Sequence, residues 1–367
     1  MRKLISDFFV GNPKIEVVGT ARNGKDAIKK IQQLKPNVVT MDVEMPEMNG
    51  LDALRQIMGF CPVPVVMLSS TTQGGAENTL TAMESGAVDF VAKPSGTISL
   101  DLHKIQDELV YKVEQAAQVS VSKLKKQIGT SHIGKQEATT YVKVSKPVRL
   151  PKPLVNKQVE SSKPFISRVK REWNNTSKKV VLIGTSTGGP RALQEVITKI
   201  PSNIQAPILI VQHMPAGFTK SLATRLDQLS EIKVKEAEQG DILQNGVAYI
   251  APGGYHLKLR KVGISFGIVL DQTEPPRSGH RPSVDVMFEE VSKYDDFDKI
   301  AVIMTGMGYD GSKGLIALKQ TGNVMAIAES ADTCIVYGMP KAAVETQLVD
   351  EVADVDNIAQ SIMKYML

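Results

Sequence analysis

The stretch from Val180 to Pro190, VVLIGTSTGGP, decides how the second half of the chain folds. It predicts a buried strand, a glycine-rich turn and the first residues of a helix. Ser186 lies at the apex of the turn, where Gly184 and Gly188 complete a G-x-S-x-G pattern. In this pattern, small residues let a sharp strand-to-helix turn lift a serine hydroxyl clear of the sheet. The stretch therefore favours an exposed, nucleophilic serine.

Two other interpretations of this turn stay open. A turn rich in Gly, Ser and Thr after a strand can be an ordinary tight turn that carries no chemistry. It can also be a phosphate-cradling loop, although it lacks the G-K-[ST] ending of a P-loop and the G-x-G-x-x-G of a dinucleotide site. The segments that follow must decide between them.

The chain has 367 residues and 42% hydrophobic content, which is enough for two domains with a core each. No apolar run reaches the roughly 18 residues that cross a bilayer, so no membrane insertion is expected. At the start, MRKLISDFFVG is interrupted by Asp7 before a signal-peptide core can form. We therefore expect a cytoplasmic protein. Cys61 and Cys334 are too few and too far apart for a metal cluster or a disulfide framework.

The positive charge is concentrated in one segment. Residues 121–179 hold 15 Lys and Arg against three Glu, or +12, whereas the whole chain carries +5, which leaves 5 − 12 = −7 for the rest. Prolines and weak hydrophobic periodicity make this segment typical of a solvated linker. A basic tether can touch nucleic acid or an anionic membrane surface. Since it lacks interleaved aromatics and a helix-turn-helix pattern, we expect no nucleic-acid partner.

The first unit alternates helical and strand periods over residues 1–94. Its expected strands are IEVVGTA (15–21), NVVTMDV (37–43), VPVVMLS (63–69) and VDFVA (88–92). Strands that alternate with helices predict a parallel sheet covered on both faces. In such sheets, ligand chemistry gathers at the carboxyl ends of the strands.

Three polar residues close strands at that edge: Asp42, Ser69 and Lys93. A carboxylate flanked by a hydroxyl and an ammonium can accept a phosphoryl group, because the transferred oxygens need cationic and hydrogen-bonding neighbours. The alternative is an ordinary loop aspartate, a strand-end serine and a surface lysine.

The stretches MDVEMPEMNG, VVMLSS and DFVAKP resemble the three signature segments of two-component receiver domains. The resemblance implies a flavodoxin-like fold in which Asp42 is phosphorylated. It also implies that Ser69 is the switch hydroxyl, Lys93 the phosphate-binding lysine and Phe90 the aromatic residue that reorients with the switch.

The start of the chain departs from the receiver pattern. Receivers begin with a hydrophobic strand ending in an acidic pair, which binds Mg²⁺ together with the acceptor aspartate, here Asp42. This sequence opens on the helix that follows, so we expect a receiver domain that lacks its first, central strand. Either the native chain begins upstream and Met1 is internal, which we favour, or this receiver cannot bind Mg²⁺ normally. The intact mass of the native protein distinguishes the two.

In the second unit, the strand PILIVQ (207–212) follows the first helix, and His213 comes directly after it. A strand-helix-strand crossover makes the two strands parallel and usually adjacent, so Ser186 and His213 should emerge at one edge. An imidazole there can act as a general base. Asp310 follows the strand KIAVIMTG in the loop GMGYDG and can hold that imidazole. Met307 or its neighbours could direct backbone N–H groups at an oxyanion.

Other histidines and carboxylates compete for these roles. His256 opens the alternating segment HLKLRK, which predicts an antiparallel ribbon. His280 lies in a polar loop beside Arg281, a setting that better suits substrate positioning. The rival carboxylates, neither of which follows a clean parallel strand, are Asp271 and Asp285.

The motifs IGTSTGGP, VQHMP, APGG, GHRPSVD and MTGMGYDG resemble the catalytic domain of the chemotaxis protein-glutamate methylesterases, the CheB family, over almost all of residues 178–365. The resemblance implies a triad of Ser186, His213 and Asp310, with Thr187 shaping the site. It also implies cofactor-free hydrolysis of glutamate methyl esters on chemoreceptors and deamidation of receptor glutamines. Phosphorylation by the chemotaxis histidine kinase, which needs Mg²⁺, would move the receiver off the serine.

We therefore expect an α/β chain in three parts: a receiver domain (1–95), a helix with a basic flexible linker (96–177) and a parallel-sheet methylesterase domain (178–367). A non-enzymatic signalling module that binds a partner through the same edge is the alternative. A transcriptional regulator with a DNA-binding linker is a weaker one. Hydrolysis that depends on Ser186 would distinguish the enzyme from both.

Overall fold

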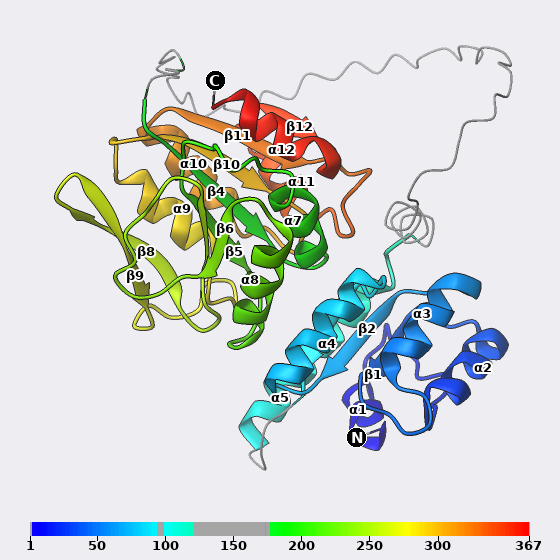
Figure 1. The fold of residues 1–367 in the computed structure, drawn as a ribbon. Helices are drawn as coiled ribbons and strands as arrows, with labels where there is room; N and C mark the ends of the chain where they lie inside the picture. The colour runs from blue at the N-terminus through cyan, green and yellow to red at the C-terminus, as the bar shows by residue number, and fades with distance from the viewer. Residues whose placement is uncertain (1, 94–98, 121–172, 174–176, 367) are drawn as a thin grey trace, which may run out of the picture.

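Long runs of buried aliphatic residues form the strands of a seven-stranded sheet in the second half of the chain (Figure 1). The structure, a computed structural model, describes residues 2–93, 99–120, 173 and 177–366, and residues 121–172 and 174–176 of the predicted basic segment lie outside them. Every pair of neighbouring strands in the sheet is parallel, in the order β12-β11-β10-β4-β5-β7-β6. The strands are β4 (Lys179–Thr185), β5 (Ile208–Gln212), β6 (Lys233–Glu236), β7 (Val247–Ile250), β10 (Asp298–Ile303), β11 (Val324–Glu329) and β12 (Glu351–Ala353).

Helices cover both faces of this sheet. Along β4, Val181 and Ile183 join one hydrophobic core, whereas Val180 and Leu182 join a second one on the opposite face. This alternation follows from the pleat, which points successive side chains to opposite faces. The helices are α7 (Gly189–Ile197), α8 (Phe218–Leu229), α9 (Val284–Ser292), α10 (Ser312–Thr321), α11 (Met339–Glu345) and α12 (Val355–Lys364).

A two-stranded antiparallel ribbon forms a separate small sheet whose apolar side chains pack on the large one. It consists of β8 (His256–Val262) and β9 (Ser265–Asp271). The prediction from the alternating segment HLKLRK is confirmed. A polar loop then leads from β9 to α9.

Residues 2–93 and 99–120 form a separate unit, the first body, and the seven-stranded sheet with its helices forms the second. The first body contains a three-stranded parallel sheet in the order β1-β2-β3. Helix α5 packs on it through Leu109, Val113 and Ala116, which share a core with Val66 and Val91. The elements are α1 (Arg2–Phe8), α2 (Gly24–Leu34), β1 (Val39–Asp42), α3 (Gly50–Phe60), β2 (Val65–Ser69), α4 (Gln73–Glu84), β3 (Asp89–Ala92) and α5 (Ser99–Ala116).

The prediction of a strand at residues 15–21 is wrong. This segment forms no strand in the structure, and Val17 and Val18 are 43% and 50% exposed. Among the described residues, no strand lies beside this segment to pair with it. Without a neighbour to accept its ladder of hydrogen bonds, the segment stays outside the sheet despite its β-branched composition.

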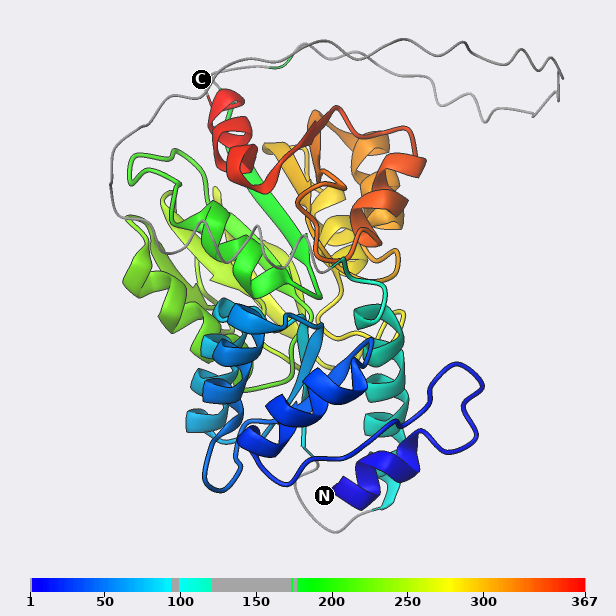
Figure 2. The ribbon, with the colours of Figure 1, turned by 90° about the vertical axis from the view of Figure 1, so that its right-hand side faces the viewer.

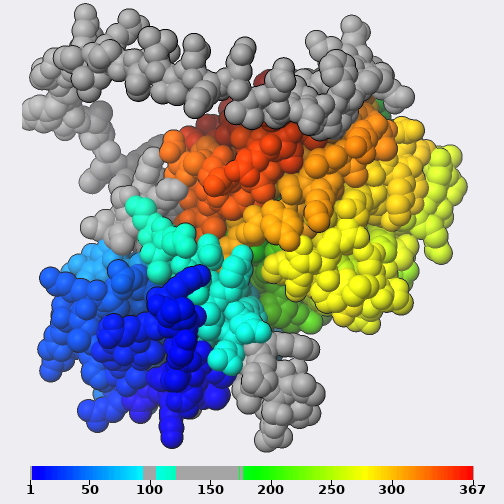
Figure 3. All heavy atoms as spheres, turned by 180° about the vertical axis from the view of Figure 1, so that it is seen from behind, coloured from blue at the N-terminus to red at the C-terminus, as the bar shows by residue number. Residues whose placement is uncertain are grey.

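The two bodies pack against each other through α4, β3 and α5 of the first (Figures 2 and 3). Helix α4 contacts α7 and α8. The ring of Phe90 stacks on that of Phe218, with 4.7 Å between centroids and 27° between planes. At the rim of the interface, the guanidinium of Arg225 donates to both carboxylate oxygens of Glu84, at 2.9 and 3.2 Å. A buried aromatic centre with a charged rim is typical of a specific interface.

Within the described ranges, no helix is long and apolar enough to cross a membrane.

Candidate active site

Ser186 directly follows the last residue of β4 and lies in a turn that only small residues can form. Gly188 has a φ of 77°, a left-handed backbone conformation that is strained for any residue with a side chain. A Cβ on Gly189 would lie 1.9 Å from both Gln212 Oε1 and Thr185 Oγ1. Gly188 and Gly189 are therefore required by the geometry of the turn.

Hydrogen bonds fix the backbone of Ser186 to both neighbouring strands. Its N–H donates to the carbonyl of Thr305, just beyond β10, at 3.0 Å. Its carbonyl accepts from Gln212 Nε2, at the end of β5, at 3.0 Å and from the Gly189 N–H at 2.7 Å. The serine is thus held at the point where β10, β4 and β5 end together. Parallel sheets place their ligand sites at such a crossover point.

His213 lies at the same rim, directly after β5. Its Nε2 is 2.7 Å from Oδ2 of Asp310, and the two side chains are 4% and 1% exposed. Nδ1 of His213 is buried and has no hydrogen-bond partner in the described part of the chain. The imidazole is thus fastened to a carboxylate through one nitrogen, and its other nitrogen is left without a partner.

The carboxylate of Asp310 sits at the N-terminus of α9. It accepts hydrogen bonds from Ser283 Oγ at 2.8 Å and from the N–H groups of Val284 and Asp285 at 2.7 and 2.9 Å. Burial alone would raise the pKa of Asp310, but the hydrogen bond and the attraction to His213, with these N–H donors, outweigh burial and lower it. Asp310 is therefore ionised at neutral pH.

Asp285 lies beside this carboxylate but does not touch His213. Its Oδ1 accepts from the N–H groups of Gly311 and Gly314, at 2.8 and 2.7 Å, while Oδ2 is buried without a hydrogen-bond partner among the described residues. Burial raises the pKa of Asp285. Repulsion from Asp310 raises it further, whereas the hydrogen bonds from the two glycine N–H groups lower it by less. Asp285 thus fastens the loop that carries Asp310 to α9.

The other candidate histidines and carboxylates occupy different places. The ring of His280 stacks on that of His213, with 3.9 Å between centroids and 9° between planes. His256 Nε2 lies 3.2 Å from the Pro275 carbonyl oxygen, at the foot of the ribbon. Asp271 pairs with Lys258 at 2.7 Å. The Arg281 guanidinium donates to two carbonyls of its own loop, those of Gln272 and Glu274, at 2.7 and 3.2 Å.

One expected contact is not made in this arrangement. No hydrogen bond joins Ser186 Oγ to His213 among the residues that the structure describes. The Thr187 hydroxyl donates its single hydrogen to the carboxylate of Asp89 in the first body, and Met307 Sδ lies 3.0 Å from the same oxygen. The backbone N–H of Met307 makes no hydrogen bond within the described ranges. The turn that bears the serine is thus engaged by the first body.

Residues of the first body reach the site through β3 and α5. Lys112 Nζ donates to Asp89 at 3.1 Å and to the Phe90 carbonyl at 2.6 Å. Burial alone would lower the pKa of Lys112, but attraction to Asp89 and Glu108 outweighs burial and raises it. A half-buried, charged lysine therefore supports the carboxylate that binds Thr187.

At the carboxyl ends of β1–β3, the structure brings two of the predicted receiver residues, Asp42 and Lys93, into contact. Lys93 Nζ lies 2.6 Å from Asp42 Oδ1, which also accepts the Glu44 N–H at 2.9 Å. Ser69 is buried and donates to the Gly75 carbonyl at 2.9 Å instead. Phe90 lies in the interface between the bodies.

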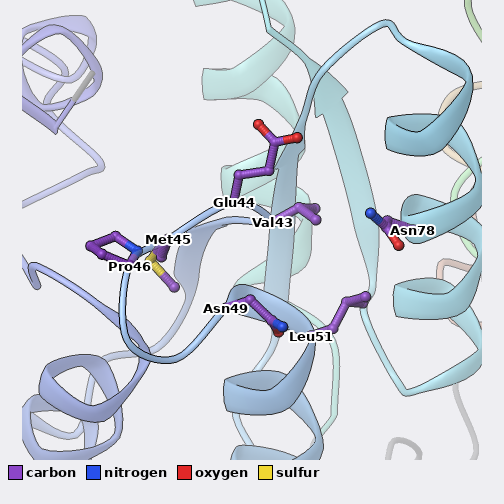
Figure 4. A pocket seen from close by; sticks show the side chains of 7 residues that line it. All are labelled: Val43, Glu44, Met45, Pro46, Asn49, Leu51 and Asn78. Carbon is purple, nitrogen blue, oxygen red and sulfur yellow. The ribbon is translucent and has the colours of Figure 1, made fainter.

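A pocket of about 510 Å³ opens beside this end of β1 (Figure 4). No group of three His, Cys, Asp or Glu side chains that could hold a metal occurs in the described ranges. Since Mg²⁺ prefers several oxygen ligands, Asp42 and the exposed Glu44 do not by themselves form its site. The pocket is lined by Val43, Glu44, Met45, Pro46, Asn49, Leu51 and Asn78.

Sequence reasoning missed several residues of this region. Asp89 and Lys112 were not singled out, and neither was Phe218. The Asp89–Thr187 contact joins residues 98 apart and the Lys112–Asp89 contact residues 23 apart, and no periodicity or spacing marks such pairs. The start of α9 could have been predicted, because Ser283 is a typical N-cap residue and Asp285 places an acidic side chain in the first turn.

Comparisons with known proteins cover both bodies. The family model described as CheB methylesterase matches residues 181–362, and the one described as response regulator receiver domain matches residues 1–103. A protein of Halalkalibacterium halodurans named protein-glutamate methylesterase/protein-glutamine glutaminase is 51% identical over 99% of this chain and 94% of its own. A protein of the same name from Bacillus subtilis is also 51% identical, over the same shares. The solved catalytic domain of Thermotoga maritima CheB methylesterase is 44% identical, covering 52% of this chain and 99% of that domain, with a TM-score of 0.49.

The raised pKa of Asp285 predicts how stability changes with pH. Between its ordinary value of 3.8 and about 6, the folded chain holds a proton on Asp285 that the unfolded chain has lost. The free energy of unfolding should therefore fall as pH rises through this window. Asp285→Asn should remove that fall, because a neutral amide oxygen can still accept the two glycine N–H bonds.

Urea titrations of both proteins at several pH values measure this difference. Asp271→Asn is the matched control with the opposite sign. Asp271 has a lowered pKa because of its hydrogen bond from Lys258, so its contribution to stability is lost as pH falls. Equal pH slopes in the native chain and Asp285→Asn would contradict the assignment.

Proposed function

The chain belongs to the CheB methylesterase family, and we propose that it is a serine hydrolase that removes methyl groups from glutamate methyl esters of chemoreceptors. Methanol is the product, and phosphorylation of the receiver controls the activity. The relatives named above are also glutaminases, so the proposal includes deamidation of receptor glutamines. The observation that carries it is the buried His213–Asp310 pair at the rim where Ser186 ends β4.

In the proposed reaction, Ser186 Oγ attacks the ester carbonyl while Nδ1 of His213 takes its proton. Nε2 is held by Asp310, so Nδ1 is the nitrogen that can accept. The ionised Asp310 stabilises the imidazolium that forms. His213 then protonates the departing methanol, which leaves an acyl ester on Ser186. Water attacks this ester while His213 takes its proton, and His213 returns the proton to Ser186 Oγ as the glutamate leaves.

An oxyanion forms at the carbonyl oxygen in each half of this reaction. The Met307 N–H supports the idea that the loop after β10 stabilises it, because that donor has no partner among the described residues. For a glutamine substrate the same steps release ammonia instead of methanol. All groups used are side chains or backbone of this chain.

We further propose that the receiver inhibits the site by docking on it. Three contacts support this: Asp89 with Thr187, Phe90 with Phe218, and Glu84 with Arg225. A phosphoryl group on Asp42 would draw Lys93 and favour an undocked arrangement, which is a shift between two populations. The partners implied are a chemotaxis histidine kinase and methylated receptors, and the setting is the cytoplasm.

Replacing the nucleophile tests the enzymatic proposal. Ser186→Ala should lower methanol release from methylated receptor membranes by at least about 10³-fold, because the covalent step is lost. Ser221→Ala, a half-buried serine of α8 whose hydroxyl bonds only its own helix, is the matched control and should keep native activity. If Ser186→Ala retains activity, the serine mechanism is excluded. A native chain that releases no methanol would favour a non-enzymatic module.

Reversing a charge at the rim of the interface tests the inhibition. Arg225→Glu places a like charge against Glu84, so basal methanol release without phosphodonor should rise roughly 3- to 10-fold. The double variant Arg225→Glu with Glu84→Arg restores opposite charges and should return to the native basal rate. A basal rate that stays native in the single variant would count against docking as the inhibitory state.

A further inference from the structure

The stacking of His280 on His213 is a feature that the mechanism above does not use. The two imidazoles lie nearly parallel, 3.9 Å apart at their centroids. No hydrogen bond of the His280 ring occurs in the described part of the chain, although its backbone exchanges two with Arg277. The ring of His280 therefore contacts the site through its stack on the face of His213.

The loop that carries His280 is itself firmly held. The N–H of Arg277 donates to the His280 carbonyl at 3.0 Å, and the reverse bond measures 2.9 Å. On the other side, the Arg281 carbonyl accepts the Gly254 N–H at 2.9 Å. The Arg277 guanidinium pairs with Glu274 at 2.7 Å. Since the backbone is fixed on both sides, the ring is placed without a hydrogen bond of its own.

His213 needs such support because Asp310 fastens only one edge of its ring. A single hydrogen bond to Nε2 leaves the ring able to turn about that contact, and such a turn moves Nδ1. Proton transfer requires Nδ1 within hydrogen-bond reach of the serine oxygen. A displacement of about 1 Å can cost roughly a hundredfold in rate. A flat group against the ring face opposes this motion.

The stack works only if one of the two rings stays uncharged. His213 becomes positive during the reaction, and two positive rings at this separation would repel. Burial lowers the pKa of His280 to about 3, helped by His213 and by Lys112 of α5 and opposed by Asp310. A neutral aromatic face attracts a cation, so His280 can stack on both charge states of His213.

We propose that His280 is a positioning residue for the general base, an uncharged aromatic plate that holds the ring plane of His213 so that Nδ1 faces Ser186. This inference rests on the proposed function, because it assigns His213 the proton transfer. It requires an aromatic face at position 280 but no ionisable group. That requirement separates it from a role in binding substrate by hydrogen bonds.

Substitutions that keep or remove the aromatic face test the inference in the full chain. His280→Ala and His280→Gln should lower kcat for methanol release roughly 10- to 100-fold with little change in KM. His280→Phe should retain most of the native kcat. Thr273→Ala, in the same loop but away from the stack, is the control and should be native. A kcat for His280→Phe as low as that of His280→Ala would overturn the inference, and so would a native kcat for His280→Gln.

A second readout does not depend on any enzyme activity. Carbon-13 and nitrogen-15 spectra of labelled histidines report the tautomer of His213, and the chain has five histidines, so substitutions can assign them. We expect one tautomer, protonated at Nε2, in the native chain and in His280→Phe, and a mixture in His280→Gln. One tautomer in all three would overturn the inference. A native chain without esterase activity that shows the expected spectra would remove the proposed function alone.

Discussion

The hydrogen bond between His213 Nε2 and Asp310 Oδ2 is the contact on which the site depends. A buried carboxylate is costly unless donors compensate for lost water, and here the N-cap residue Ser283 and the first two residues of α9 supply three of them. The N-terminus of that helix also favours negative charge. Asp285 anchors the loop that bears Asp310. Within the described residues its Oδ2 is buried without a hydrogen-bond partner, which is unfavourable for an ionised carboxylate.

Topology brings these groups together from distant parts of the chain. Strand β4 lies between β5 and β10, so the residues that follow the three strands share one rim. The same rim receives the receiver, whose Asp89 binds the residue after Ser186. Catalytic geometry and its control therefore meet within one turn. Under the proposed inhibition, phosphorylation of Asp42, at the opposite end of β1–β3, acts on Ser186 by releasing the docked receiver and not by direct contact.

Much of this arrangement could be predicted from the sequence. The crossover β4-α7-β5 implied that Ser186 and His213 meet at one edge, and the alternating pattern of β8 implied the ribbon. The strand predicted at residues 15–21 failed because pairing partners, and not composition, make a strand. The docking of Phe90 on Phe218 and the stack of His280 on His213 could not be predicted. Both depend on surfaces of separate elements fitting together, and neither leaves a period or spacing in the sequence.

The central claim is that the docked receiver restricts access to Ser186. The most direct measurement is the rate at which a small fluorophosphonate labels Ser186, with the labelled residue identified by mass spectrometry. The account predicts slow labelling of the native chain and faster labelling, confined to Ser186, when a small phosphodonor is added, with no acceleration in Asp42→Asn. Equal rates with and without phosphodonor, or labelling at another serine, would contradict it.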